Sequence, residues 1–574
     1  MRSKALSALC TGLLVFYFIA FFLMPLVYIA GLTFYDSDGK FSGLKNLTEY
    51  FSSPNMVSSF VHSFTVSGIV TVVTFTLAFF YAYSISRIRV KGSYAFRYMA
   101  MLSLFTPTML HALALIYLFG RQGFVSKLFL TWLNTALGTD FAFPFEIYGA
   151  TGIIISEVIY TFPHAYLILS VSFAMSDYRL YEAAETLGAG RLRKFFTVTL
   201  PSVKYGAVSS LATIFILSFT DMGAPKIVGG QYNVMAVDIY KQVIGQQNFA
   251  MGATVAVLLM VPALIAFCID RLIQKKQDAS FSSKSVPYMV KPNKTAETAA
   301  FIYCLVIAIC IAAVIGTSVF VSFISFFPYD LTFTLKHYMF KYVAGDFSSY
   351  VNSLKMSFLT ALFGTVSAFA VAYTAEKTRM NVIISRMPYA LSVATLAVPG
   401  LVIGLAYIFF FNNPEVSFFF FTVKNPFLPV YGTIWILVLA NVMHFIAVPV
   451  MTITSSLKKQ DREYDNVAES MGVHPARTLF RVTLPLSVTA VTETFFYFFV
   501  NSMVTISAVI FLYAQDTRPA TVAIVNMDDA GDTSAAAAMA SLILFTNMAF
   551  KIAYDAASKY IRKKTAAWQS VQRN

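Results

Sequence analysis

The chain has 574 residues, of which 57% are hydrophobic and only 12% are charged. Its mean hydropathy of +0.68 excludes an ordinary soluble protein of this length. The formal net charge is +14, which in a soluble protein would suggest binding to nucleic acid. Because the basic residues follow the connections between apolar segments, we attribute the charge to membrane topology and expect no nucleic-acid partner.

Long apolar segments follow one another along the whole chain. A hydrocarbon core roughly 30 Å thick needs about 20 such residues for each helical span, and segments of this length exclude the short alternating strands of a membrane β-barrel. We therefore predict an all-α polytopic membrane protein in the lipid bilayer, with about twelve transmembrane helices near residues 8–34, 57–86, 98–120, 150–175, 203–228, 249–269, 299–325, 351–375, 387–411, 431–456, 487–513 and 534–556.

The first apolar segment, residues 8–34, follows a basic tip like that of a signal peptide. Its apolar run is too long for a cleaved signal and no small-residue cleavage site follows it, so we expect it to remain as the first span. The cysteines lie within or at the ends of spans without metal-binding spacing. We interpret them as small buried hydrophobic residues and expect no metal site: Cys10, Cys268, Cys304 and Cys310.

Basic residues occupy alternate connections between the predicted spans. Examples are residues 87–97, residues 191–204 and the tail at 562–564. The connections between them are near neutral or acidic, as at residues 528–532. The positive-inside rule then places the basic connections and both termini in the cytoplasm.

A polar, serine-rich and basic stretch at residues 271–297 divides the spans six and six. We predict a first transmembrane domain at residues 1–270, a cytoplasmic linker at 271–297 and a second transmembrane domain at 298–574. An even number of spans returns the chain to the same side of the membrane. The two domains are therefore expected to be parallel six-helix repeats.

One polar stretch between spans occurs twice, as YEAAETLGAGRLRKFFTVTLP at residues 181–201 and as YDNVAESMGVHPARTLFRVTLP at residues 464–485. The offset of 284 that separates Asp177 from Asp461 aligns the copies without a gap. It also matches Ala184 with Ala468, Glu185 with Glu469, Gly188 with Gly472, and Pro201 with Pro485. One copy alone could be an interfacial helix held against lipid headgroups, but two copies in register indicate a symmetric partner with two sites.

The residue types of the first copy predict a short helix, a turn and a second helix. Asp177 can cap the first helix, and Glu182 and Glu185 lie toward its positive end. Gly188 can end this helix in the left-handed conformation, and Pro201 can occupy the first turn of the next span. Small residues at helical spacing leave a flat face that another backbone can approach: Ala183, Ala184 and Leu187.

The stretch EAAETLG…LP resembles the EAA signature of the permease subunits of ATP-binding-cassette (ABC) importers with the type I, MetI-like fold. In that family the motif forms a coupling helix, which docks in a groove of a cytosolic ATPase. The resemblance covers the whole chain, with both permease domains fused. It implies ATPase-coupling residues at Glu182, Ala183, Ala184, Glu185, Gly188 and Pro201, and at Ala468, Glu469, Gly472 and Pro485. The second copy departs from the signature, because Asn466 and Val467 replace its first glutamate and alanine.

The resemblance implies the permease subunit of an importer in a bacterial inner membrane. A cytosolic ABC ATPase homodimer would move the docked helices, and a periplasmic or extracellular substrate-binding protein would deliver a small solute. The chain would then be no enzyme and would bind no cofactor, since ATP is used by the partner ATPase. Its only Gly-Lys pair, Gly39-Lys40, precedes Phe41 and is therefore no phosphate-binding P-loop.

Two other function classes stay open. An ion-coupled secondary transporter also has about twelve spans, with ionisable residues near the membrane midplane. The charged candidates within the spans are few, namely Glu157, Glu493 and Lys551. In either kind of transporter, Glu157, His164 and His444 are our candidates for lining the translocation path. Secondary transporters often have inverted repeats, whereas these repeats are parallel, which favours the ABC importer. A membrane enzyme would need a ligand spacing that the histidines within spans lack.

Substrate is suggested by two stretches that begin at Asp221 and Thr505. They resemble fused permeases for 2-aminoethylphosphonate, whose broader relatives are ferric-iron and sugar-phosphate permeases. The resemblance places 2-aminoethylphosphonate first, other phosphorylated organic solutes second and ferric iron third. Acidic residues outnumber basic ones in these outer stretches. We expect one acidic cluster to dock the binding protein rather than to hold a metal: Asp528, Asp529 and Asp532.

Overall fold

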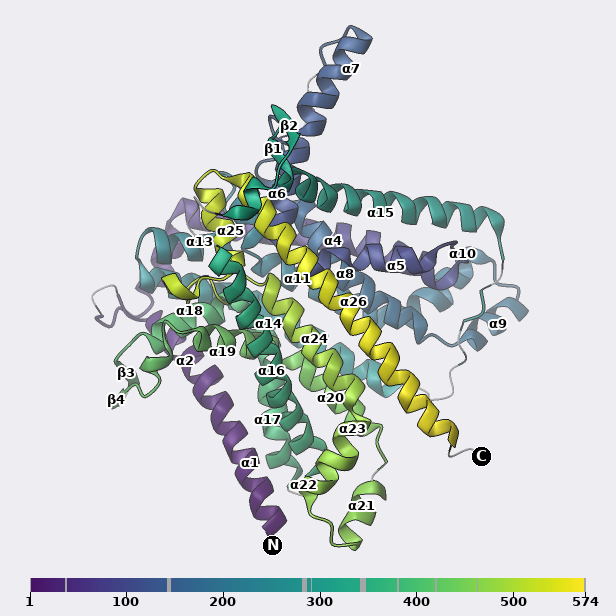
Figure 1. Cartoon of the computed structure of the whole chain (residues 1–574), viewed down its shortest axis with the longest axis vertical. Helices are drawn as coiled ribbons and strands as arrows, with labels where there is room; N and C mark the ends of the chain where they lie inside the picture. The colour runs from purple at the N-terminus through teal and green to yellow at the C-terminus, as the bar shows by residue number, and fades with distance from the viewer. Residues whose placement is uncertain are drawn as a thin grey trace. The chain divides into compact units, whose positions relative to one another are not determined.

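Helices form nearly all of the regular structure in the computed structural model of the chain (Figure 1). The structure describes residues 2–36, 39–141, 146–280, 286, 288–290, 292–340, 347–378, 381–418, 421–461 and 463–571. Within these residues, 9 helices are long and apolar enough to cross a membrane, and the number rises to 12 if each of three bent helix pairs is one span. The predicted all-α membrane fold is therefore confirmed.

Contacts divide the chain into two compact units, which we call the N-unit and the C-unit. The N-unit comprises Leu44–Phe340 and Met527–Ser541, and the C-unit comprises Met1–Gly43, Lys341–Asn526 and Leu542–Asn574. These units differ from the two halves of the sequence. The first span belongs to the C-unit, whereas the span that follows the linker belongs to the N-unit. The division of the sequence at residues 271–297 stays a prediction about the repeat.

Four long helices form the centre of the N-unit: α4 (Pro54–Arg87), α8 (Ala150–Ala174), α11 (Leu200–Thr220) and α14 (Phe249–Ser280). Helix α15 (Lys294–Ser322) packs against α4, α5 (Ser93–Met101) and α6 (Thr108–Phe119) (Figure 1). The shorter elements are α3 (Lys45–Ser52), α7 (Leu130–Leu137), α9 (Tyr178–Thr186), α10 (Arg191–Lys194), α12 (Gly223–Val228), α13 (Met235–Tyr240), and the paired antiparallel strands β1 (Ile324–Phe326) and β2 (Asp330–Phe333).

Helix α16 (Phe347–Lys377) is the centre of the C-unit. It packs against α17 (Val382–Ala394), α19 (Ile434–Phe445), α20 (Ala447–Lys458) and α24 (Val488–Val504), while α1 (Arg2–Phe18) and α2 (Met24–Leu32) pack against α17 and α18 (Gly400–Phe411) respectively. The shorter elements are α21 (Glu463–Ser470), α22 (Pro475–Thr478), α23 (Leu484–Leu486), and the paired antiparallel strands β3 (Glu415–Phe418) and β4 (Phe421–Lys424). Helices α25 (Ala520–Asp529) and α26 (Thr533–Val571) each contribute to both units.

Two predicted spans are broken at a proline. The segment predicted at 98–120 divides between α5 and α6 before Pro107, and the segment at 387–411 bends by 108° before α18. The residue before each proline is extended, with ψ of 142° at Thr106 and 119° at Val398. The proline ring disfavours helical backbone at the preceding residue, so each predicted apolar segment contains a break that hydropathy does not indicate.

Two other predicted spans end early at equivalent positions. Helices α11 and α24 end at Thr220 and Val504, although the spans were expected to continue to residues 228 and 513. The next residues, Asp221 and Thr505, are extended, with ψ of 138° and 140°. The two halves of the sequence thus break their apolar segments at the same point of the repeat.

A weaker sequence echo also has a structural counterpart. HSFTVS in the first half and NSLKMS in the second contain Ser63 and Ser353. Ser63 Oγ accepts a hydrogen bond from the backbone N–H of Met235 at 2.8 Å, and Ser353 Oγ accepts one from Ala520 at 2.7 Å. Each buried serine therefore ties a long helix to the start of a short helix in its own unit.

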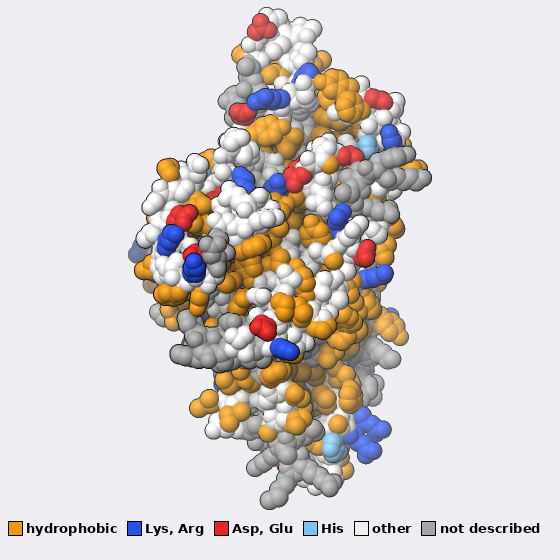
Figure 2. Space-filling model, turned by 90° about the vertical axis from the view of Figure 1, so that its left-hand side faces the viewer, with side chains coloured by type: hydrophobic (Ala, Val, Ile, Leu, Met, Phe, Trp, Pro, Cys, Tyr) orange, Lys and Arg blue, Asp and Glu red, His pale blue; other side chains and the backbone are white. Residues whose placement is uncertain are grey.

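Hydrophobic side chains cover much of the face drawn in Figure 2, among few charged ones. Large apolar residues are exposed along the spanning helices, for example Val72, Ile309 and Val366. Such side chains suit contact with lipid tails. The cysteines were expected to be buried, but only Cys304 is; Cys10, Cys268 and Cys310 lie on exposed helix surfaces.

Candidate functional site

The first repeated stretch forms the predicted helix, turn and helix. Asp177 caps α9 by accepting a hydrogen bond from the backbone N–H of Arg179 at 3.1 Å. Gly188 ends the turn with φ of +73°, where its N–H bonds to the Glu185 carbonyl at 3.0 Å. A left-handed residue at this place is the usual helix ending that satisfies the last carbonyls. Pro201 lies in the first turn of α11, as expected.

The second stretch repeats this backbone. Asp461 accepts a hydrogen bond at 3.0 Å from the N–H of Glu463, two residues later. In the first copy Asp177 accepts the equivalent bond from Arg179. Gly472 has φ of +67°, and its N–H bonds to the Glu469 carbonyl at 2.9 Å. Pro485 lies in the first turn of α23. The offset of 284 therefore aligns structure as well as sequence.

Apolar side chains point outward from both stretches at matching positions. Leu187 is 84% exposed, and Met471, its match in the second copy, is 74% exposed. Phe196 and Phe480 form a second exposed pair. On the face predicted to be small and flat, Ala183 and Leu187 are exposed and Ala184 is partly exposed. Equivalent apolar groups repeated on two otherwise polar stretches indicate an interaction surface.

The glutamates of the motif have different surroundings. Glu182 is exposed. The carboxylate of Glu185 lies 3.6 Å from the ammonium nitrogen of Lys194, across the glycine turn. Thr478 occupies the position of Lys194 in the second copy, so Glu469 cannot make the same ion pair. The two exposed surfaces therefore differ in charge although they share a backbone.

Arg87, the last residue of α4, is buried beneath the first stretch. Its guanidinium donates hydrogen bonds to the Phe173 carbonyl at 2.8 Å and to the Ser176 hydroxyl. It also lies 5.4 Å from the ring centre of Tyr181 on α9 and 4.2 Å from that of Tyr288. Cation–π attraction at these distances ties α9 to the end of a spanning helix.

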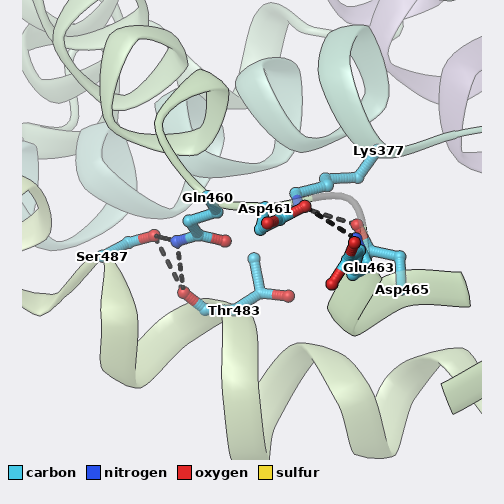
Figure 3. Close-up of polar contacts among 7 residues, drawn as sticks. All are labelled: Lys377, Gln460, Asp461, Glu463, Asp465, Thr483 and Ser487. Carbon is cyan, nitrogen blue, oxygen red and sulfur yellow. Dashed lines mark hydrogen bonds and ion pairs between the residues drawn. The ribbon is translucent and has the colours of Figure 1, made fainter. Parts of the chain in front are cut away.

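Lys377, the last residue of α16, holds the second stretch by an ion pair (Figure 3). Its Nζ lies 2.7 Å from Oδ2 of Asp465 on α21. The side chain of Lys377 is only 6% exposed and that of Asp465 is 32% exposed. Asp465 stands at the position that Tyr181 has in the first copy. The same fastening point is therefore charged in one copy and aromatic in the other.

Gln460 fixes the start of the second stretch. Its side-chain amide donates to the Thr483 carbonyl at 3.2 Å and to the Ser487 hydroxyl at 2.8 Å (Figure 3). These bonds join the residue before Asp461 to the segment that leads into α24. The loop is thus held at its base as well as along α21.

Among the candidates for a translocation path, Glu157 is fully buried on α8. Its carboxyl group lies near that of Asp221 at the end of α11, but within the described residues neither of its oxygens has a hydrogen-bond partner. Asp221 accepts bonds from the Thr108 hydroxyl at 3.2 Å and from the Ala224 N–H at 3.0 Å. Asp221 begins one of the two stretches that we expect on the outer side, and the structure brings it next to Glu157.

The two candidate histidines do not join this carboxyl pair. A ring nitrogen of His164 on α8 bonds to the Tyr160 carbonyl at 3.3 Å. His444 lies on α19 of the C-unit, close against Gly400.

Gly400 and Gly404 on α18 have the GxxxG spacing that is typical of close helix packing. A Cβ at Gly404 would lie 2.9 Å from the Ala508 carbonyl oxygen, so this glycine pair serves close packing.

The three acids predicted to dock a binding protein have separate surroundings. Asp529 forms an ion pair with Lys226 at 2.9 Å, and Asp532 caps α26 by accepting from the Ala535 N–H at 3.0 Å. Burial and the adjacent Asp529 carboxylate raise the pKa of Asp528 to about 6, although Lys226 opposes the rise. They are therefore not one uniform solvated cluster.

A family model described as the binding-protein-dependent transport system inner membrane component matches the chain twice, at residues 74–278 and 362–563. Each match contains one copy of the repeated stretch, and together they cover more than half of the chain. The chain belongs to this family. It is a fused type I permease of the ABC importer class, with two permease repeats in one polypeptide.

Two of the similar permeases extend over most of the chain, and a third matches about one third of it. The ferric transport system permease protein FbpB of Actinobacillus pleuropneumoniae is 26% identical over 557 residues, which are 95% of this chain and 76% of the relative. The putative ferric transport system permease protein FbpB 1 of Haemophilus influenzae is 27% identical over 526 residues, 89% of this chain and 78% of the relative. The molybdenum transport system permease protein ModB of Haemophilus influenzae is 26% identical over 208 residues, 35% of this chain and 87% of the relative.

Sequence reasoning about this permease missed the residues that fasten the loop helices. Arg87 appeared only as part of the basic connection at residues 87–97, and Lys377, Tyr181 and Asp465 were not singled out. Two features could have indicated these residues. Each cation is the last residue of a long helix, and the offset of 284 matches Tyr181 with Asp465.

Proposed function

We propose that this permease forms the membrane path of an ATP-driven importer of ferric iron. The observation that carries the proposal is the pair of exposed loop helices with the same cap, turn and outward apolar positions. Two equivalent sites on one chain suit a symmetric partner, and an ABC ATPase homodimer in the cytoplasm is such a partner. ATP binding and hydrolysis then belong to that ATPase, while this chain needs no cofactor of its own.

Each loop helix would transmit movement of the ATPase to a span. Helix α9 is fastened to α4 through Arg87, and α21 is fastened to α16 through Lys377. When the ATPase dimer closes on ATP, both docked helices move and carry the ends of these spans with them. This arrangement requires both loops on the cytoplasmic side, with both termini there and the chain in the inner membrane of a bacterial cell.

The order of substrates inferred from the sequence is revised. The relatives that extend over most of the chain are named for ferric iron, which we had placed third after 2-aminoethylphosphonate. The position of Asp221 beside the buried Glu157 supports the revision. Carboxyl oxygens suit a small, highly charged cation, whereas they would repel the phosphonate group of 2-aminoethylphosphonate and attract only its ammonium group. In an importer of ferric iron this pair would lie on the cation's route.

A binding protein would deliver the iron to the opposite side, where we place Asp528, Asp529 and Asp532. Substituting all three by Asn should weaken the complex with the binding protein and make it less sensitive to salt. Because the pKa of Asp528 is about 6, protonation should also weaken the wild-type complex as the pH falls through 6. Unchanged affinity and salt dependence, measured with the permease in nanodiscs, would contradict a docking role.

Uptake by reconstituted vesicles tests the proposed function. Vesicles that contain the permease, its ATPase and its iron-loaded binding protein should accumulate radioactive ferric iron only when ATP is supplied. An excess of 2-aminoethylphosphonate should not compete. Uptake driven by a proton or sodium gradient without the ATPase would overturn the importer proposal in favour of a secondary transporter, and uptake of the phosphonate instead of iron would overturn the substrate.

A further inference from the structure

The described residues of the linker contact the first loop helix. The Tyr178 N–H donates to the Val286 carbonyl at 3.0 Å, and the Val286 N–H donates to Asp177 Oδ1 at 3.3 Å. Asp177 is the cap of α9, so the linker bonds to the residue that starts the helix. The backbone N–H groups of Arg179 and Val286 hold the pKa of Asp177 below its usual range. The carboxylate form thus joins linker and helix.

Tyr288 adds an aromatic contact two residues later. Its ring meets those of Tyr178 and Tyr181 edge-on, with ring centres 5.4 Å and 4.9 Å apart. The same ring lies 4.2 Å from the guanidinium carbon of Arg87. Tyr288 therefore fills the space between α9 and the end of α4, and it touches both.

In the second copy a carboxylate compensates the charge of the buried cation. A cation buried at the end of a long helix needs a compensating group. Asp465 supplies that group for Lys377, but its match in the first copy is Tyr181. Among the residues that the structure describes, no ion pair joins Arg87 to a carboxylate. Carbonyl, hydroxyl and ring faces take that place, and Tyr288 provides the nearest ring.

We propose that Val286 and Tyr288 are positioning residues for α9. In this role the linker does for α9 what the ion pair between Lys377 and Asp465 does for α21. The linker is then more than a connection between two permease repeats, because it forms part of the first ATPase-coupling site. The role in coupling rests on the proposed function, whereas the anchoring of α9 can be measured without the ATPase. Loss of the Tyr288 ring should loosen α9 and leave α21 unaffected.

Hydrogen exchange of the purified full chain in lipid nanodiscs tests the anchoring. In Tyr288→Ala the amides of α9 should exchange roughly tenfold faster, the change expected from losing a desolvated cation–π contact. Tyr288→Phe keeps the ring and should exchange like the unaltered chain. The amides of α21 are the internal control in both variants, and they should not change.

A second variant asks whether a carboxylate can replace the linker. Tyr181→Asp places the residue type of the second copy opposite Arg87, so Tyr181→Asp/Tyr288→Ala should recover slow exchange in α9 relative to Tyr288→Ala. A general loss of folding would not be repaired in this way. Unchanged exchange in Tyr288→Ala, equal loosening in Tyr288→Phe, or absence of recovery in the double variant would each overturn the assignment.

Iron transported per ATP hydrolysed, in vesicles with the ATPase and binding protein, separates this inference from the proposed function. Tyr288→Ala should lower that ratio several-fold, and Tyr181→Asp/Tyr288→Ala should restore it. If α9 loosens while the ratio stays unchanged, the anchoring stands and the coupling role of α9 fails. If α9 does not loosen, the positioning role of the linker fails whatever the transport result.

Discussion

Helices α9 and α21 can be compared directly, because the same backbone is fastened in two ways. Both begin with an aspartate cap and end at a left-handed glycine, Gly188 or Gly472. Under α9, however, the buried Arg87 meets aromatic rings and the linker, whereas under α21 the buried Lys377 meets Asp465. The two copies share the left-handed glycine turn, which few other residues can adopt. They differ in the groups that stabilise the buried cation.

The two fastenings should respond differently to change. An aromatic face attracts a cation without a formal charge, with about 0.5–2 kcal/mol per contact. An ion pair loses its partner completely when one residue is removed, which leaves the other charge buried and uncompensated. Substitutions common to both copies should therefore act alike, and substitutions at the fastening points should not.

The largest effect is expected at the shared turn. Gly188→Val and Gly472→Val each place a β-branched residue at positive φ, at a cost of about 1–3 kcal/mol in the loop. Both variants should reach the membrane at near-normal abundance, co-purify roughly tenfold less ATPase and lose uptake. Co-purification from membranes measures this. If both variants keep the ATPase and transport iron, the stretches are only interfacial loops.

The ion pair under α21 should show the next largest effect. Asp465→Ala leaves Lys377 buried without its carboxylate, which should destabilise the loop by about 1–3 kcal/mol. Lys377→Ala/Asp465→Ala removes both charges and should recover part of that loss. Uptake and the thermal unfolding of nanodisc samples measure both. Asp461→Asn is the matched control, because asparagine also caps a helix. Equal behaviour of Asp465→Ala and this control would refute the fastening.

A smaller effect concerns the exposed charges of the motif. Glu182 is replaced by Asn466 in the second copy, so Glu182→Ala should weaken ATPase binding by about 1 kcal/mol, roughly fivefold, and Asn466→Ala should have less effect. Glu185→Ala and Glu469→Ala should both weaken ATPase binding, and they differ in that only Glu185→Ala also removes the ion pair with Lys194. Affinity of the ATPase for nanodisc samples measures all four. Equal losses of ATPase affinity in Glu182→Ala and Asn466→Ala would contradict the predicted difference between the two surfaces.

The smallest effect is expected from the pH dependence of the Asp177 cap. Its pKa is lowered in the folded protein by backbone hydrogen bonds, so the contribution of the carboxylate is present above the ordinary aspartate pKa of about 3.9 and is lost as the pH falls through the lowered value. Contact with the linker should therefore persist at every pH above about 4. Exchange at the Val286 amide measures it. If the Val286 amide already loses its protection at about pH 5–6, the assignment is contradicted.

Local chemistry made much of the site predictable. The cap at Asp177, the turns at Gly188 and Gly472, and the places of Pro201 and Pro485 follow from residues a few positions apart. The fastening points do not, because Lys377 and Asp465 are 88 positions apart in the chain. No periodicity indicates that pairing. Equally, hydropathy located the first span but could not assign it to the C-unit, since it does not specify which helices pack together.

Places where a span breaks were harder to predict than the spans themselves. The run at 387–411 is mostly apolar and has no charged residue, yet it bends at the extended Val398 before Pro399. Hydropathy alone also gave no sign that Asp221, at the end of a span, lies beside the buried Glu157. Contacts between distant helices decide both features.

Cross-linking to the ATPase tests most directly whether both loop helices are docking sites. Leu187 and Met471 are matched and exposed, so Leu187→Cys and Met471→Cys, each in an otherwise cysteine-free chain, should reach the same groove on the two ATPase subunits. We predict that each variant cross-links to one ATPase subunit and that the double variant cross-links to two. Absence of cross-linking at both positions, in a complex that still transports iron with ATP, would contradict the account.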